Sequence, residues 1–255
     1  MSGRRLMTVV LAVAALAASG CGSSSGGGKP DLVVSAAASL KDAFTQYAQK
    51  FPDATIRASF AGSDELAAQI QQGVRPDVFA SANTKLPDEL FQKGLVQKPV
   101  VFAGNRLVIA VPASGGKVSS IDDLEKPGVT VAMGSASVPV GIYTRKVLSG
   151  LPEDQSSKLL ANVRSNEPDV AGVVGKVSQG AVDAGFVYIT DVDATDGKLK
   201  AIELPKTLQP QVAYGVAVVK GAKHPREARE FIDGLLDADG RRALDAAGFE
   251  PPPAQ

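Results

Sequence analysis

Four short segments of the chain place small or hydroxyl residues where a helix is expected to begin. They are Ala36-Ala37-Ala38-Ser39, Phe60-Ala61-Gly62-Ser63, Val138-Pro139-Val140-Gly141 and Pro168-Asp169-Val170. The first N–H groups of a helix lack partners inside it and carry about half a positive charge, so each start can hold an anion. The Ser39 and Ser63 hydroxyls could add further donors. Helix capping explains either serine taken alone, but four comparable segments in one chain favour an anion site without specifying the anion.

The elements that would position these segments alternate between strands and helices. Strands are predicted at residues 32–36, 54–60, 76–82, 107–111, 129–133, 163–165, 184–188 and 214–219. Helices are predicted after Ser39 and Ser63 and at residues 86–93, 120–124, 140–149, 169–179, 225–236 and 241–247. This alternation predicts an α/β fold with mostly parallel sheets flanked by helices. In such sheets ligands bind beyond the carboxyl ends of the strands, where the four segments fall.

The composition excludes several kinds of site. The 255 residues contain 27 basic and 27 acidic side chains, one His, one Cys and no Trp. A general basic field for nucleic acid is therefore absent, as are zinc clusters and disulfides within the chain. No phosphate-binding loop ending in Gly-Lys-Ser or Gly-Lys-Thr is present. The Gly-x-Ser-x-Gly pattern occurs at residues 22–26 without a preceding strand, so it does not predict a nucleophile.

Two other kinds of protein remain as alternatives. A secreted hydrolase would have to use His224, which lies just before an expected helix and is more typical of a surface or capping position. A calcium site could use Asp191, Asp193 and Asp196. A calcium loop starting at Asp191 requires Gly at its sixth position and Glu at its twelfth, where this chain has Asp196 and Ile202.

The first thirty residues resemble an export and anchoring signal. Arg4 and Arg5 precede the apolar run 6–18, which is shorter than the roughly 20 residues of a membrane-spanning helix. Residues 1–20 are predicted to be a lipoprotein signal peptide, and Ala18-Ser19-Gly20-Cys21 resembles a lipobox, with Ala18 in place of the usual Leu. Cys21 would then carry the lipid, and residues 21–30 would form a flexible Gly/Ser linker. Removal of residues 1–20 leaves 25 basic and 27 acidic residues.

Five ordered motifs give the chain a family resemblance over residues 31–255. They are Ala36-Ala37-Ala38-Ser39-Leu40, residues 60–70, residues 76–82, residues 138–143 and residues 186–191. These motifs resemble those of the molybdate-binding proteins that feed ABC importers, a branch of the two-lobed periplasmic binding proteins. The resemblance implies lobe I at residues 31–107 plus 212–255, lobe II at 108–211, and a ligand cleft between them.

The resemblance also implies a set of neutral donors for a tetrahedral oxyanion. Ser39 and Ser63 would each give a hydroxyl and a backbone N–H, Val140 and Val170 a backbone N–H, and Tyr188 its phenol. Molybdenum would be bound only as its oxyanion, through these donors, with no direct metal ligand from the protein. The resemblance implies no cofactor and no catalytic residue. Asp64, beside Ser63, is expected to point to solvent, since an inward carboxylate would repel a dianion.

These residues predict an extracytoplasmic lipoprotein, anchored through Cys21 to the cell membrane. It would act as a monomer that captures molybdate or tungstate and delivers it to an ABC permease, without nucleic acid as a partner. A sulfate or thiosulfate binder of the same fold remains open, because these anions differ from molybdate mainly in bond length.

Overall fold

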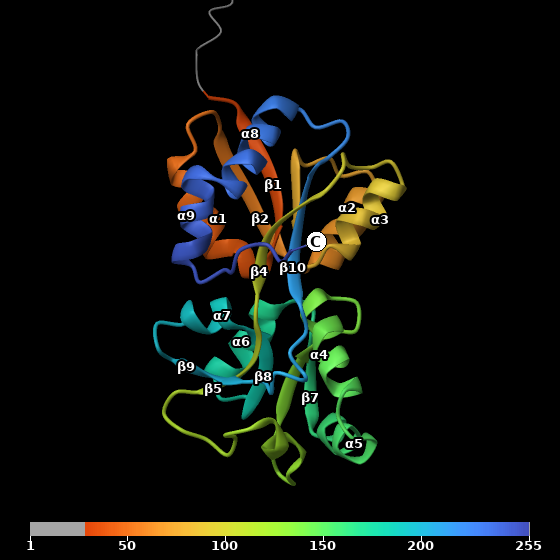
Figure 1. The fold of residues 1–255 in the computed structure, drawn as a ribbon, viewed down its shortest axis with the longest axis vertical. Coiled ribbons are helices and arrows are strands. Elements are labelled where there is room, and N and C mark those ends of the chain that lie inside the picture. Colours follow the sequence, from red (N-terminus) through yellow and green to blue (C-terminus); the bar gives the residue numbers. More distant parts are fainter. Residues whose placement is uncertain (1–28, 255) are drawn as a thin grey trace, which may run out of the picture.

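The computed structural model describes residues 29–254, except for the side chain of Ala238. It contains two five-stranded sheets that follow one another along the longest axis (Figure 1). The first has the order β2-β1-β3-β10-β4, from β1 (Asp31–Ala37), β2 (Thr55–Ala61), β3 (Val78–Ser81), β4 (Val100–Asn105) and β10 (Val212–Val218). The second has the order β7-β6-β8-β5-β9, from β5 (Leu107–Pro112), β6 (Val131–Gly134), β7 (Val163–Glu167), β8 (Ala184–Tyr188) and β9 (Leu199–Glu203).

Each sheet has one strand that runs against the others. In the first sheet β1 is parallel to β2 and β3, whereas β10 is antiparallel to β3 and β4. In the second sheet β6 is parallel to β7 and β8, whereas β5 is antiparallel to β8 and β9. The predicted α/β fold, with two lobes and mostly parallel strands, is therefore confirmed, and the reversed strands are β10 and β5.

Helices cover both sheets. Around the first lie α1 (Lys41–Lys50), α2 (Ser63–Gln71), α3 (Lys85–Gln92), α8 (Pro225–Leu236) and α9 (Ala238–Ala246), with the short 3₁₀ helix η1 (Ala38–Leu40) leading into α1. Around the second lie η2 (Ile121–Glu125), α4 (Pro139–Ser149), α5 (Glu153–Ala161), α6 (Val170–Ser178) and α7 (Ile189–Asp193).

The apolar periodicity of α1 and α8 explains why these two helices pack together. Phe44 and Tyr47 of α1 contact Phe231 of α8, with ring centroids 5.4 and 4.8 Å apart. All three rings are buried, so this aromatic cluster fixes α1, and with it the segment that carries Ser39, on the first sheet.

The chain passes between the sheets at two connections. Only Arg106 separates β4 from β5, and residues 204–211 join β9 to β10. β4 and β10 are neighbours in one sheet, and β5 and β9 are neighbours in the other. Both connections therefore lie at one side of the sheets, as a hinge requires. The predicted lobe boundaries stay a prediction.

Four elements were not predicted from the sequence. Two are strands at sheet edges, β4 and β9, and two are helices, α5 and α7. Gly104-Asn105 at the end of β4 suggests a turn, and Lys200 and Glu203 interrupt any apolar run in β9. Along α5 only Leu159 is buried. These elements are positioned by long-range pairing and packing, which a local pattern does not reveal.

The predicted signal peptide, Cys21 and most of the predicted linker lie outside the described residues. Within residues 29–254, no helix is long and apolar enough to cross a membrane.

Candidate functional site

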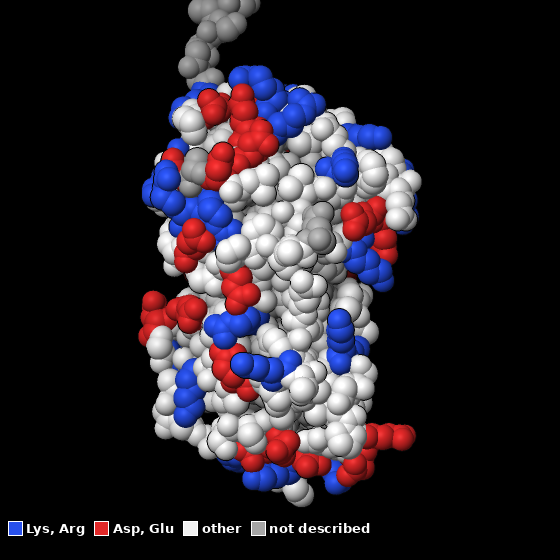
Figure 2. Space-filling model, in the orientation of Figure 1, with Lys and Arg blue, Asp and Glu red and all other residues white. Residues whose placement is uncertain are grey.

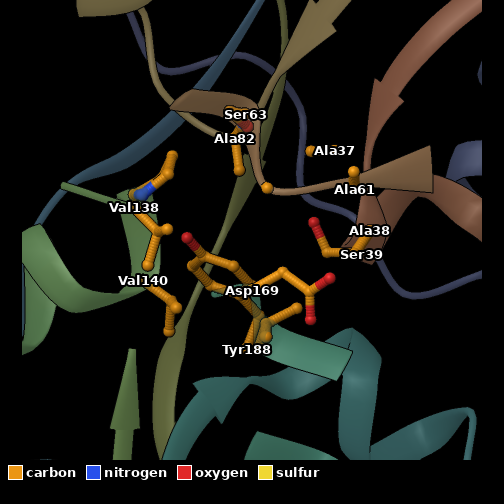
Figure 3. Close-up of a pocket in the computed structure, with 13 residues that line it drawn as sticks. Ala37, Ala38, Ser39, Ala61, Ser63, Ala82, Val138, Val140, Asp169 and Tyr188 are labelled. Carbon is orange, nitrogen blue, oxygen red and sulfur yellow. The ribbon is translucent and has the colours of Figure 1, made fainter. Parts of the chain in front are cut away.

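A small pocket lies between the two sheets. Its lining comes from both lobes: Ala37, Ala38, Ser39, Ala61, Gly62, Ser63, Ala82, Val138, Pro139, Val140, Asp169, Val170 and Tyr188 (Figure 3). The cavity has a volume of about 20 Å³. Drug-sized ligands occupy sites of about 300–1,000 Å³, so this pocket suits a smaller ligand of a few atoms.

Four helix starts converge on this pocket, and they are the four segments singled out in the sequence. Ser39 lies in η1 just before α1, Ser63 is the first residue of α2, Val140 the second of α4 and Val170 the first of α6. Backbone N–H groups at these positions have no partner within their helices. Their dipoles add positive potential at one point, which favours a negatively charged ligand.

Both serine hydroxyls already have a hydrogen-bond partner within the protein. Ser63 Oγ accepts a hydrogen bond of 3.1 Å from the Ala82 N–H. Ser39 Oγ lies 2.9 Å from the Tyr214 hydroxyl. Because Ser63 is an acceptor in this contact, its own hydrogen is free to be donated to a ligand.

Tyr188, at the end of β8, brings a phenol that has no partner. The residue is 1% exposed, and within residues 29–254 no group is hydrogen-bonded to its hydroxyl. Burial raises the pKa of this phenol well above its ordinary value, so the group stays a neutral donor at physiological pH. A buried hydroxyl without a partner costs about 1–3 kcal/mol, which a ligand in the pocket can recover.

The pocket wall also contains a carboxylate that the sequence reasoning did not place there. Asp169 caps α6, where its Oδ1 accepts a hydrogen bond of 2.9 Å from the Gly172 N–H, and it extends toward Ser39 (Figure 3). No Lys, Arg or His occurs among the described lining residues. The wall therefore combines neutral donors with a single acidic group.

The expectation that Asp64 points to solvent is wrong for one of its oxygens. Asp64 Oδ1 is buried and has no hydrogen-bond partner among the described residues. The atom lies beside Gly62, where a Cβ atom would be 2.9 Å from it. The carboxylate therefore turns back toward the start of its own helix, where the helix dipole favours negative charge.

Gly62 lets the two lobes touch. A Cβ atom at Gly62 would lie 2.5 Å from the carbonyl oxygen of Pro168, which is too close for any real contact. Gly62 precedes α2 in one lobe and Pro168 precedes α6 in the other. The glycine thus permits an approach of two backbones beside the pocket, and no larger residue could do so.

Asp191 lies behind the pocket and is linked to it through Tyr188. Its Oδ2 accepts a hydrogen bond of 2.9 Å from the Tyr188 N–H. Desolvation raises the pKa of Asp191 to about 7. The negative charges of Asp169 and Asp42 raise it as well, whereas this hydrogen bond lowers it. Its charge therefore changes near neutral pH, close to the helix starts.

The structure brings together all five residues carried over from the resemblance: Ser39, Ser63, Val140, Val170 and Tyr188. Sequence reasoning missed the groups behind them, namely Tyr214, Asn105 and the Ala82 N–H. Tyr214 falls within an apolar strand pattern and Asn105 within a missed strand, so neither carried a local signal.

The residues of the two alternatives do not line the pocket. His224 caps α8, and its backbone N–H donates to Asp77 Oδ1 over 2.8 Å. Within residues 29–254, no hydrogen bond joins its imidazole to a hydroxyl group. Asp191 and Asp193 lie on α7, and no group of three or more His, Cys, Asp or Glu in the described part of the chain could hold a metal ion.

The face of the molecule drawn in Figure 2 has no field of a single sign. Lys and Arg are interspersed with Asp and Glu over the face drawn in Figure 2. With no Lys, Arg or His among the described residues that line it, attraction of an anion to the pocket depends on the local dipoles of the helix starts.

Comparisons with known proteins agree with this geometry. Residues 32–250 match the model of the family described as bacterial extracellular solute-binding protein. The molybdate-binding protein ModA of Mycobacterium tuberculosis is 37% identical over 246 residues, which cover 91% of this chain and 92% of that protein. ModA of Escherichia coli is 33% identical, with 86% and 88% covered.

A solved structure extends the likeness to the fold. The periplasmic molybdate-binding protein of Azotobacter vinelandii superposes with a TM-score of 0.78 at 22% identity, over 87% of this chain and 100% of that one. At this identity the likeness concerns the fold alone. The family match, which spans nearly all the described residues, shows that this chain belongs to the bacterial extracellular solute-binding proteins.

Proposed function

We propose that this protein captures molybdate outside the cytoplasm and delivers it to an ABC permease, with tungstate bound comparably. The observation that carries the proposal is the convergence of four helix starts, two serine hydroxyls and an unpartnered buried phenol on one pocket without a basic side chain. The similarity to ModA proteins directs the choice of oxyanion to molybdate.

The proposed donors are Ser39, Ser63, Val140, Val170 and Tyr188. A fully deprotonated tetrahedral dianion can accept hydrogen bonds from all of them. Each hydrogen bond to a charged group contributes roughly 1.5–3 kcal/mol, and submicromolar affinity requires about 8 kcal/mol or slightly more in total. Seven such bonds sum to about 10–21 kcal/mol, of which the costs of ordering and desolvation take back a large part.

Neutral donors also suit a protein that must release its ligand. No ion pair has to be broken when the lobes open, because no basic side chain of the described residues lines the pocket. The donors on η1 and α2 then separate from those on β8, α4 and α6. Opening therefore removes about half of the hydrogen bonds at once, and the anion becomes available to the permease.

Calorimetric titration of the full chain with molybdate, tungstate, sulfate and phosphate tests the assignment. We expect molybdate and tungstate to bind with similar affinity and to displace one another, with sulfate and phosphate far weaker. Tight sulfate binding without molybdate heat would contradict the assignment in favour of a sulfate binder of the same fold.

The lipid anchor is a separate proposal that concerns Cys21. In cells that process lipoproteins, the chain should partition with the membrane fraction, and Cys21→Ser should release it. Loss of Cys21 should leave the affinity for molybdate unchanged, because the pocket begins at Ala37. Membrane association that persists in Cys21→Ser would contradict the anchor without affecting the proposed ligand.

A further inference from the structure

A chain of buried polar groups leads from Ser39 across the molecule to the second lobe. Ser39 Oγ lies 2.9 Å from the Tyr214 hydroxyl, and Asn105 Nδ2 donates to that hydroxyl over 3.4 Å. Asn105 Nδ2 also donates to Thr190 Oγ1 of α7 over 3.0 Å. Tyr214 is fully buried and Asn105 is 3% exposed, so the two contacts of Asn105 are shielded from water, whereas the contact at Ser39 is part-buried beside the pocket.

The donors and acceptors of this chain can be assigned from Asn105. Its Oδ1 accepts a hydrogen bond of 2.8 Å from the Arg106 N–H, which fixes which side of the amide is oxygen. The Nδ2 atom can only donate, so the Tyr214 oxygen accepts from it. Of the described groups within hydrogen-bond distance of the Tyr214 hydroxyl, only Ser39 Oγ can accept its hydrogen. Burial raises the pKa of Tyr214 well above its ordinary value, so this hydrogen is retained at all physiological pH values.

Ser39 therefore receives a hydrogen bond from behind, and its own hydrogen is left to point into the pocket. Ser63 is arranged in the same way, because the Ala82 N–H donates to its oxygen. A backbone N–H cannot reverse its direction, so Ser63 is fixed by the main chain. Ser39 depends on two side chains, and its direction can be altered by mutation.

We propose that Tyr214 and Asn105 are positioning residues that hold the Ser39 hydroxyl as a donor and thereby favour fully deprotonated oxyanions over protonated ones. The proposal rests on the proposed function, since it takes Ser39 as a ligand group. A hydroxyl fixed as a donor meets every oxygen of a dianion favourably. A protonated anion such as dihydrogen phosphate would bring its own O–H against the hydrogen that Ser39 holds toward the pocket.

Tyr214→Phe removes the donor behind Ser39 and leaves the ring in the core. We expect about a three- to ten-fold loss of molybdate affinity, the usual effect of one hydrogen bond. In a Ser39→Ala background the same change should have no further effect, because the group it positions is gone. Tyr47→Phe is the matched control: Tyr47 is also buried in the first lobe, but its hydroxyl donates to the Phe231 carbonyl.

Asn105→Asp tests the direction of the hydrogen bond between Tyr214 and Ser39. An aspartate at this position can accept from Tyr214, which would draw the phenol hydrogen away from Ser39. Ser39 would then donate to Tyr214 and offer a lone pair to the pocket. We expect molybdate affinity to fall further than in Tyr214→Phe, while phosphate gains relative to molybdate at pH 6, where it is mostly singly charged. Thermal melting of each variant establishes whether it is folded. If Asn105→Asp does not fold, Tyr214→Phe alone tests the proposal.

The readouts separate positioning from a general loss of structure. A structural effect weakens molybdate and phosphate by the same factor, whereas the proposal requires their ratio to change. Equal factors, an unchanged affinity in Tyr214→Phe, or the same loss in the Ser39→Ala background would each overturn it. If the unaltered chain binds sulfate and not molybdate, the proposed function fails, and the same double-mutant cycle with sulfate still decides the role of Tyr214.

Discussion

Replacing Gly62 by alanine tests whether the contact between the lobes is needed for tight binding. The φ and ψ angles of Gly62 are −60° and 133°, which alanine adopts without strain. The change should therefore alter the stability of the anion-free protein by no more than about 1 kcal/mol, the sum of a poorer helix cap and a less flexible unfolded chain.

The magnitude of the effect on binding follows from one distance. The new Cβ atom would be 2.5 Å from the Pro168 carbonyl oxygen, whereas ordinary contacts begin at 3.4 Å. The lobes must separate by about 0.9 Å at this point, and a hydrogen bond of about 2.9 Å from the nearby Val170 N–H would stretch beyond the 3.5 Å limit. Loss of that bond costs about 1.5–3 kcal/mol, or 10- to 150-fold in affinity.

Calorimetry with molybdate measures this loss, and thermal melting without anion measures stability. Gly116→Ala serves as the control, because a Cβ atom there meets nothing within 4 Å. If Gly62→Ala binds molybdate as tightly as the unaltered chain, the approach of Gly62 to Pro168 is not part of the binding state and the reasoning is refuted.

Three further predictions concern groups in or behind the pocket. Tyr188→Phe should weaken molybdate binding by about 1.5–3 kcal/mol yet raise the anion-free melting temperature, because it removes a buried hydroxyl without a partner; a lower melting temperature would contradict this. Asp169→Asn should tighten binding, since the cap is kept and a negative charge near the anion is lost, and weaker binding by calorimetry would count against it. Asp191 has a pKa raised to about 7, so its protonated form is favoured by folding, and its contribution to stability falls as pH rises from about 4 to 7. A bound dianion raises that pKa further, so affinity should increase from pH 8 to pH 6, and Asp191→Asn should flatten the dependence; an equally steep profile in this variant would assign the effect to another group.

Much of the candidate site could be predicted because it is local in sequence. Each of the four helix starts is a short segment in which a strand or loop ends in small residues, and this pattern is visible without the fold. Capping and anion binding use the same backbone groups, so the pattern alone left the ligand open. Tyr188 came from the resemblance, because an apolar strand that ends in tyrosine is typical of an ordinary core.

The groups behind the site could not be predicted, for a physical reason. Tyr214 is 175 residues from Ser39 along the chain, and Asn105 is 109 residues from Tyr214. Their contacts exist only because β10 and β4 pair at the side of the sheet that leads to the hinge. The strand that holds Asn105 ends in Gly104-Asn105, which suggests a turn in the absence of its partners. Asp169 was recognised as part of a helix start, but the direction of its side chain depends on the packing of α6 against η1.

The order of the strands determines how far each part of the pocket moves when the lobes rotate about the connections. β2 and β7, which end near Gly62 and Pro168, are the edge strands farthest from the connections, whereas Tyr188 ends a strand beside β5. With strands about 4.8 Å apart, the outer edge lies about 15 Å from the axis, so a rotation of about 4° opens it by 1 Å but moves Tyr188 by about a third as much. The hydrogen bonds to the anion should therefore break in sequence, that of Val170 before that of Val140 and that of Tyr188 last. A small rotation would admit water beside Gly62 and Pro168 while Tyr188 still binds the anion. Release would then proceed from the outer edge of the pocket toward the connections.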